Sequence, residues 1–99
     1  MVSLYTMLSS LGLPVSYRFF KSPPAPPYIV YLFSYSDNFG ADNKVYSKED
    51  NYKVELYSTK KDLASEKLIE DLFDSYEIFY DKTETYIESE GLYQVLYEI

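Results

Sequence analysis

The clearest pattern of hydrophobic and polar positions lies in the middle of the chain. Residues 28–36 are almost continuously apolar or aromatic, which is typical of a central strand covered on both faces. Residues 52–59 alternate between apolar and polar side chains, as a strand with one buried face does. Between them, residues 37–43 combine Asp, Asn and Gly40, which favours a turn, and residues 44–47 briefly resume the strand pattern. This part of the chain is therefore predicted to form a β-meander around a polar loop.

Two segments have the apolar period of a helix. Ser3 can cap a short first helix, and Gly12 stands where the C-terminal cap of that helix is expected. Asp62 can cap a second helix that runs to about Tyr76. The apolar stripe of the second helix is predicted to consist of Leu68, Ile69, Leu72, Phe73 and Tyr76. Its water-facing side is predicted to consist of Glu66, Lys67, Glu70, Asp71 and Asp74.

The remaining segments complete an α+β pattern. Residues 15–20 are expected to form a first strand, and residues 22–27, which contain four prolines, a stiff extended connection. Residues 78–87 and 92–99 are expected to form a closing hairpin around residues 88–91. The order of elements predicts an α+β fold: a mostly antiparallel sheet of about five or six strands, with two helices packed on one face.

The composition narrows the classes of function. A chain of 99 residues, 46% of them hydrophobic, is expected to fold over residues 1–99 as a single domain with one core. The chain contains no cysteine and no histidine, which excludes disulfides, thiolate metal sites and the commonest general base. We therefore expect no catalytic residue, no metal site and no cofactor, and a non-enzymatic role; a small enzyme remains an open alternative.

The net charge of −7 is divided unevenly along the chain. Residues 1–48 carry four cationic and two acidic side chains (+2), whereas residues 49–99 carry five lysines and fourteen acids (−9). Such an acidic half argues against binding to nucleic acid, which needs clustered Lys and Arg. No stretch approaches the ~18–20 apolar residues that cross a membrane, and the first residues lack the cations of a signal peptide. The protein is expected to be soluble, intracellular when made, and without a membrane partner.

Two clusters of acidic residues are candidates for ion binding or acid–base catalysis. The loop at residues 37–43 has several oxygen-bearing side chains, but the twelfth position from Asp37 is Lys48, which excludes an EF-hand. An irregular ion site there stays open, and Asx turns explain the same residues more simply. Glu84, Glu88 and Glu90 could pair for acid–base chemistry, but their shared strand parity favours a solvated outward face.

Thirteen tyrosines and six phenylalanines are too many for the core of so small a domain. Tyrosine has an apolar ring and a polar tip, and it is enriched at protein interfaces. The alternative is that these rings lie half-buried on strands, where β-propensity favours them. The candidates for an interaction surface are Tyr28, Phe39, Tyr57, Tyr86, Tyr93, Glu84, Glu88 and Glu90.

Three parts of the chain resemble a known family. They are residues 35–43 with Tyr46, residues 52–57, and residues 83–90 with 93–97. Their sequences are similar to small tail proteins of siphophages and of prophages of Gram-positive bacteria, which are described as tail-completion, tail-terminator or head–tail joining proteins. The matching motifs are structural and include no catalytic signature.

The resemblance implies a non-catalytic virion protein of the phage tail, made in the host cytoplasm. It implies an α+β subunit that forms a ring with copies of itself, often a hexamer, at the head-proximal end of the tail. Its partners would be the major tail-tube protein and the head–tail connector protein. Such a ring stops growth of the tail tube and gives the connector a docking surface.

One further function from another class fits the charge. A small acidic phage inhibitor can imitate nucleic acid and occupy a basic groove of a host protein, and the −9 half of this chain suits that role. However, the acids are interspersed with Lys60, Lys61, Lys67 and Lys82 rather than set in uninterrupted rows.

Overall fold

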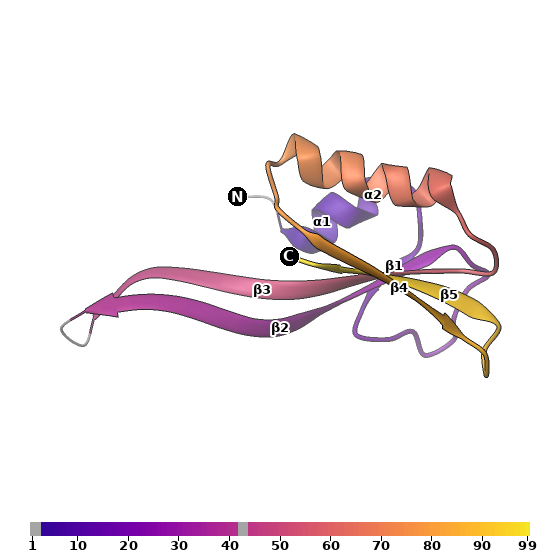
Figure 1. Cartoon of the computed structure of the whole chain (residues 1–99), viewed down its shortest axis with the longest axis horizontal. Helices are drawn as coiled ribbons and strands as arrows, with labels where there is room; N and C mark the ends of the chain where they lie inside the picture. Colours follow the sequence, from indigo (N-terminus) through magenta and orange to yellow (C-terminus); the bar gives the residue numbers. More distant parts are fainter. Residues whose placement is uncertain (1–2, 42–43) are drawn as a thin grey trace.

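The computed structural model describes residues 3–41 and 44–99, with side chains at 3–35 and 51–99. The elements follow the order α1 (Leu4–Ser9), β1 (Val15–Tyr17), β2 (Tyr28–Ala41), β3 (Lys44–Ser58), α2 (Leu63–Ser75), β4 (Asp81–Ile87) and β5 (Leu92–Glu98) (Figure 1). Over these residues the strands form one sheet of five, in the order β1-β2-β3-β5-β4. Only the β1–β2 pair is parallel. The predicted α+β fold is confirmed.

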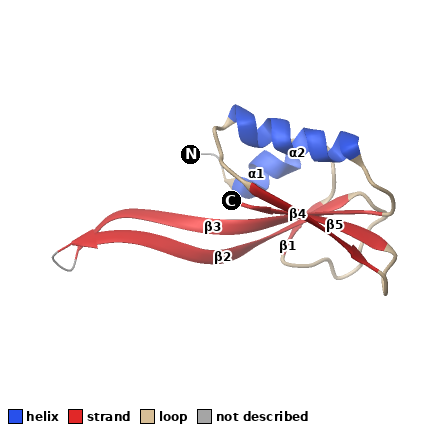
Figure 2. Ribbon diagram, viewed as in Figure 1, coloured by secondary structure: helices blue, strands red, loops and turns tan. Residues whose placement is uncertain are grey.

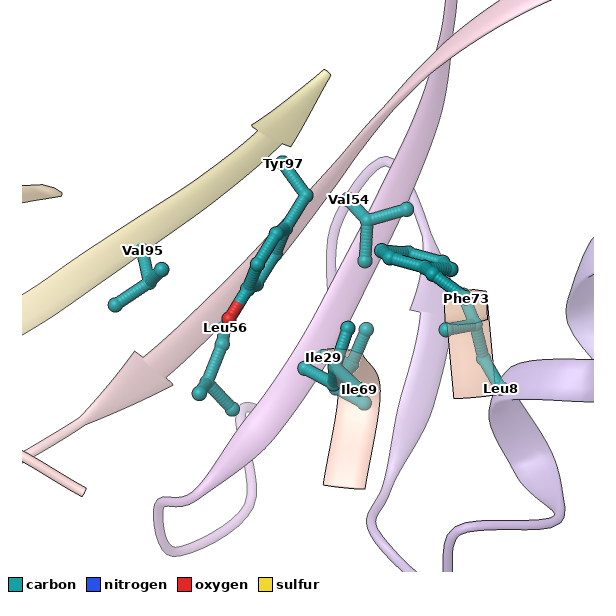
Figure 3. Close-up of a cluster of buried hydrophobic side chains, with 8 residues drawn as sticks. All are labelled: Leu8, Ile29, Val54, Leu56, Ile69, Phe73, Val95 and Tyr97. Carbon is teal, nitrogen blue, oxygen red and sulfur yellow. The ribbon is translucent and has the colours of Figure 1, made fainter. Parts of the chain in front are cut away.

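Both helices cover the same face of the sheet, as predicted (Figure 2). The side chains that meet between the helices and the sheet form one core, which Figure 3 shows. The fully buried members of the core are Leu8, Ile29, Val54, Leu56, Ile69, Phe73, Val95 and Tyr97. The register explains why three strands contribute together: Ile29 lies beside Leu56, and Leu56 beside Val95, so the three side chains share one face.

Local capping fixes where both helices begin. The Ser3 hydroxyl accepts the backbone N–H of Thr6 at 3.2 Å, and Asp62 Oδ1 accepts the N–H of Ser65 at 3.0 Å. These are the two caps that the sequence predicts. The first helix ends earlier than expected, at Ser9, and Gly12 follows in the left-handed conformation with φ +84°. Glycine tolerates this conformation without strain, so the chain can turn there towards β1.

The predicted apolar stripe of α2 is only partly correct. Ile69 and Phe73 are fully buried, and Leu72 is half-buried. Leu68 and Tyr76 are 43% and 47% exposed, because α2 rests on the sheet along a narrower line than its hydrophobic residues cover. Glu66, by contrast, was predicted to face water and is buried.

Strand β1 is shorter than predicted. It ends at Tyr17 because Arg18 has a left-handed backbone conformation, φ +69°, which turns the chain away from the sheet. The predicted strand at residues 15–20 was therefore wrong over its second half. Residues 18–27 instead connect β1 to β2 on the face of the sheet opposite the helices, where Phe20 packs edge-on against Tyr28 at 5.3 Å.

The largest departure from the sequence prediction lies between β2 and β3. Instead of a loop at residues 37–43 and two short strands, β2 continues to Ala41 and β3 runs without interruption from Lys44. Asp37 pairs with Glu49 and Phe39 with Ser47, with irregularities in register near each end of this stretch. Residues 42–43 lie outside the described part of the chain, so the predicted polar loop is wrong over residues 37–41.

Candidate interaction surface

The two long strands project beyond the rest of the sheet as a hairpin, named here the arm (residues 33–41 and 44–52). Strand β1 pairs with β2 only as far as Tyr31, and β5 pairs with β3 only from Lys53 onward. The protein is consequently 50 Å long but only 28 and 23 Å across, and the arm makes up its long axis in Figure 1. Nine residues per strand correspond to about 30 Å of projecting ribbon.

Both edges of the outer arm lack a third strand within the described part of the chain. Near the root, the N–H of Phe33 donates to the Tyr17 hydroxyl at 3.2 Å, and the N–H of Ile99 donates to the carbonyl of Tyr52 at 2.9 Å. Beyond those two contacts, no β-ladder is formed on the outer side of residues 35–41 or of residues 44–50. Unpaired strand edges are templates for another strand, and an isolated two-stranded ribbon is marginally stable in water.

The β2 side of the arm has few of the features that protect an exposed edge, whereas the β3 side carries Lys44 and Lys48. On the β2 side, residues 32–41 contain a single charged residue, Asp37, and no proline. The register places Asp37 opposite Glu49 and Ser36 opposite Asp50, which brings three acids into one short stretch of the ribbon beside a single cation, Lys48. Like charges on opposing residues destabilise a ladder. The arm therefore combines open backbone groups with a local excess of negative charge.

Exposed aromatic residues surround the root of the arm. Phe79 is 83% exposed and Tyr35 is 56% exposed, and both line a pocket of about 300 Å³ where β5 ends and β3 continues. Tyr52 and Ile99 line the same pocket. The ring of Tyr52 meets that of Phe33 edge-on at 5.9 Å, and Phe33 is 40% exposed. These rings leave apolar surface open at the point where the arm leaves the domain.

A second groove lies towards the other end of the protein, beside the 18–27 connection. This groove, named here the aromatic groove, has a volume of about 230 Å³. Its lining includes Arg18, Phe19, Phe20, Tyr28, Tyr57 and Glu90. Phe19 is 62% exposed at its rim, and Arg18 and Lys21 are also exposed. No ion pair joins either cation to an acid among the described residues.

The structure places two of the predicted interaction tyrosines inside the protein's own contacts. Tyr28 is only 8% exposed, because Phe20 and Tyr57 cover its ring, and Tyr57 stacks on it at 5.2 Å. The Tyr57 hydroxyl donates to Glu55 Oε1 at 2.9 Å and accepts from Gln94 Nε2 at 2.8 Å. Burial, followed by the bond to Glu55, raises the pKa of Tyr57. Tyr28 is thus unavailable as an exposed contact residue, and the hydroxyl of Tyr57 is already satisfied.

The other predicted residues are more accessible or fall elsewhere. Tyr86 is 49% exposed and packs against the half-buried Tyr93 at 4.8 Å, so this pair remains a candidate contact. Glu88 and Glu90 are exposed in the turn between β4 and β5, as predicted. The side chain of Phe39 lies outside the described residues.

Glu84 does not share an outward face with the acids of the turn. It pairs with Val95 in the ladder, which places it on the helix-covered face, where it contacts Lys61. The predicted common parity of the three glutamates fails because Glu88 and Glu90 belong to the turn and not to the strand.

The buried carboxylate of Glu66 belongs to an ionic cluster beneath α2. Its two oxygens lie 2.7 Å from Lys61 Nζ and 2.7 Å from Lys82 Nζ, with the side chain 3% exposed. These two contacts with lysine ammonium groups compensate the charge of the buried carboxylate. Lys82 also donates to Glu70 Oε2 at 2.7 Å, and the Tyr97 hydroxyl donates to the same oxygen at 2.7 Å.

The cluster joins α2 to β4 and β5. The sequence prediction assigned Glu66 and Glu70 to the water-facing side of α2, and this was wrong because β4 brings Lys82 under that side of the helix. Their i, i+4 spacing and the single lysine in β4 were the available signal. Each acid is neutralised by protein cations, so the cluster is structural.

The cluster predicts a stability profile with pH. Burial disfavours the charge of Glu66, but Lys61 and Lys82 outweigh burial and hold its pKa below the ordinary 4.5. Because its pKa is lower in the folded protein than in the unfolded chain, ionised Glu66 stabilises the fold above pH 4.5. This contribution is lost as the pH falls through the pKa of Glu66 in the folded protein. Contacts with Glu66 and Glu70 raise the pKa of Lys82 from 10.5 to about 12. Its contribution is complete below pH 10.5 and disappears as the pH rises through about 12.

Urea unfolding at a series of pH values checks this profile. The unfolding free energy should be flat near neutrality and fall below pH 4.5. Other carboxylates also titrate in acid, so Glu66→Gln is the control: its acid slope should be shallower than that of the unsubstituted protein. Equal slopes for the two proteins would show that Glu66 carries no part of the pH dependence.

Neither a metal cluster nor a membrane-spanning helix is found within residues 3–41 and 44–99. No protein-family model matches the chain, and no curated protein matches it. By its structure the protein is a small α+β domain with a projecting two-stranded arm and exposed aromatic residues at the root of the arm.

Proposed function

We propose that this protein is a non-catalytic assembly subunit that completes a phage tail at its head-proximal end and helps to join the tail to the head connector. The observation that carries the proposal is the arm, whose outer backbone edges have no third strand within the described residues. A strand edge of this kind gains stability when it is covered by a neighbouring subunit.

The arrangement of surfaces supports repeated assembly. The arm projects from one end of the domain, and the aromatic groove lies towards the other end. Two different surfaces on one subunit allow head-to-tail contacts, and such contacts close into a ring when the rotation between subunits permits it. A ring of copies, such as a hexamer, would then meet the major tail-tube protein on one side and the connector protein on the other.

The phage tail is proposed as the assembly because residues 35–43, 52–57 and 83–97 resemble small siphophage tail proteins. Two of these three stretches contribute to the arm or its root, since residues 35–41 form the outer part of β2 and Tyr52 lies in β3. The resemblance and the projecting hairpin thus point to the same part of the protein.

The acidic-inhibitor alternative draws less support from the structure. Several acids of the second half are already paired with lysines of the same chain: Glu66, Glu70, Asp71 and Glu84. A nucleic-acid mimic needs its carboxylates displayed to a partner's cations.

Electron microscopy of phage particles produced without this protein tests the proposal. We expect overlong tails or finished tails that are not attached to heads, because tube growth would lack its stop and the connector its docking surface. Complementation with the full chain should restore joined particles. Normal, infectious virions in the absence of the protein would overturn the proposed function.

A further inference from the structure

The pocket at the root of the arm, named here the root pocket, is an apolar site that is open to a partner. Its volume is about 300 Å³, and Tyr35, Tyr52 and Phe79 line it. Phe79 is 83% exposed and Tyr35 is 56% exposed, so two of the three rings are largely uncovered. A pocket of this size beside exposed rings can bury one large side chain of a partner.

Three charged residues also line the root pocket, and their charges are unbalanced. The register places Lys53 beside Glu98 and Glu98 beside Asp81, so the three side chains form one row on the same face of the sheet. No ion pair joins any of them to another charge within the described residues. Two acids directly opposite each other destabilise a ladder. A cation from another molecule, placed beside Asp81 and Glu98, would relieve this repulsion.

The segment at residues 18–21, named here the Phe19 segment, has the opposite charge. Phe19 is 62% exposed and lies between two exposed cations, Arg18 and Lys21. Neither cation forms an ion pair within the part of the chain that the structure describes. The neighbouring aromatic groove adds Glu90, which leaves two cations against one acid here and two acids against one cation in the root pocket. The two surfaces are therefore complementary in charge, and both offer exposed aromatic rings.

The Phe19 segment and the root pocket do not meet within one copy. Glu90, which lines the aromatic groove together with Phe19, belongs to the turn at one end of the β4–β5 hairpin. Asp81 and Glu98 pair at the other end of that hairpin. Six residue steps along β4 span roughly 20 Å, and Figure 1 shows the turn of this hairpin at the end of the domain away from the arm. A contact between the two surfaces therefore joins two copies of the chain.

We propose that the Phe19 segment of one copy docks in the root pocket of the next copy, with Arg18 and Lys21 facing Asp81 and Glu98. This inference rests on the proposed assembly function and names the two surfaces that join the subunits. The wall of the root pocket includes residues of the arm, so the docked copy lies against the root of the arm. The contact joins unlike surfaces, and its repetition gives a ring or an open chain of subunits.

Cross-linking between engineered cysteines tests the contact, since the chain has no cysteine of its own. Ser22→Cys adjoins the Phe19 segment, and Thr83→Cys lies two residues after Asp81 on the same face of β4. Both positions are exposed, and neither substitution removes a residue of the proposed contact. A mixture of the two variants, oxidised at high protein concentration, should give a disulfide-linked dimer several-fold more abundantly than either variant alone. Ser9→Cys, an exposed position on α1, is the matched control and should cross-link with neither.

The other outcomes contradict the proposal. More efficient cross-linking of Thr83→Cys with itself than with Ser22→Cys would mean that two root pockets face each other. No cross-link in the mixture, or a monomer at every concentration, would mean that a different protein covers the root pocket. Neither result would alter the expected particle defect, so a failure of this inference is distinguishable from a failure of the proposed function.

Charge reversal at Asp81 gives an independent readout of the same contact. Asp81→Lys should weaken self-association about tenfold, because it places a cation opposite Arg18 and Lys21. The same change removes the repulsion with Glu98, so the variant should unfold at a higher urea concentration than the unsubstituted protein. These opposite shifts separate a docking role from a structural one. Lys21→Glu in the same chain should restore much of the association, and Asp71→Lys, the same charge change on the exposed side of α2, is the control. Unchanged association of the Asp81→Lys variant would overturn the proposal.

Discussion

Shortening the arm is expected to abolish self-association and tail completion while leaving the domain folded. The variant joins Ser34 to Asn51 through an Asn-Gly turn, which suits a tight hairpin. The eight fully buried core residues among those with described side chains lie outside the deleted segment. The unfolding free energy should therefore change by no more than about 1 kcal/mol, since the arm pairs with no third strand of the sheet and can be removed without breaking the β1, β4 or β5 ladders.

Sedimentation velocity across a concentration series, with thermal unfolding of the same samples, measures both effects. A matched control keeps the arm at full length and replaces the exposed Phe79 at its root by serine. The control separates loss of the arm from loss of nearby apolar surface. If the shortened chain associated as strongly as the full chain, the arm would not be the element that mediates self-association.

Replacement of Lys82 by methionine is expected to cause the largest loss of stability among the charged residues. Lys82 contacts both Glu66 and Glu70, and the Glu66 side chain is 3% exposed. A buried carboxylate that loses a cation is costly, typically ~3–5 kcal/mol when its pair is fully broken. We expect about 2 kcal/mol, because Lys61 continues to pair with Glu66.

The midpoint of urea unfolding measures the cost. Lys67→Met is the matched control, because among the described residues Lys67 pairs with Asp71 alone, on the exposed side of α2, and its loss should have no measurable effect. A Glu66→Met, Lys82→Met double variant should recover part of the stability, since two apolar side chains replace a buried pair. If Lys82→Met were as stable as Lys67→Met, the cluster would have no structural role.

Local signals in the sequence were sufficient for the helices and the closing hairpin. Ser3 and Asp62 are caps whose partners lie three residues away, so their effect does not depend on distant parts of the chain. The turn at residues 88–91 is likewise local, with Gly91 in the left-handed conformation. These elements were predicted in the right places because short-range interactions determine them, although α1 ends earlier than expected and β4 begins at Asp81 rather than at residue 78.

The arm was not predicted, because residues 37–41 have a composition that is typical of a turn. Asp37, Asn38 and Gly40 each favour loops on local propensity, yet they pair with residues of β3 along a continuous ladder. The pairing depends on the register of two strands set in the domain body, where Ile29 opposes Leu56. A single-sequence pattern does not report how far such a ladder continues.

The candidate surface was predicted only in part, for a similar reason. Glu66 follows the helical pattern of a water-facing residue, and its burial depends on where β4 is placed in the sheet. Tyr28 was predicted to be an exposed contact residue, but the ring of Phe20, eight positions earlier in the chain, covers it. Both errors concern tertiary neighbours, which periodicity within one element does not reveal.

Electron microscopy of particles complemented with the arm-shortened chain tests the central claim most directly. The account predicts that the shortened protein accumulates in folded form but leaves tails overlong or separated from heads, as in particles that lack the protein. The full-length chain, expressed at the same level, should give joined tails of uniform length. Joined tails of normal length with the shortened chain would contradict the claim that this protein acts through its arm.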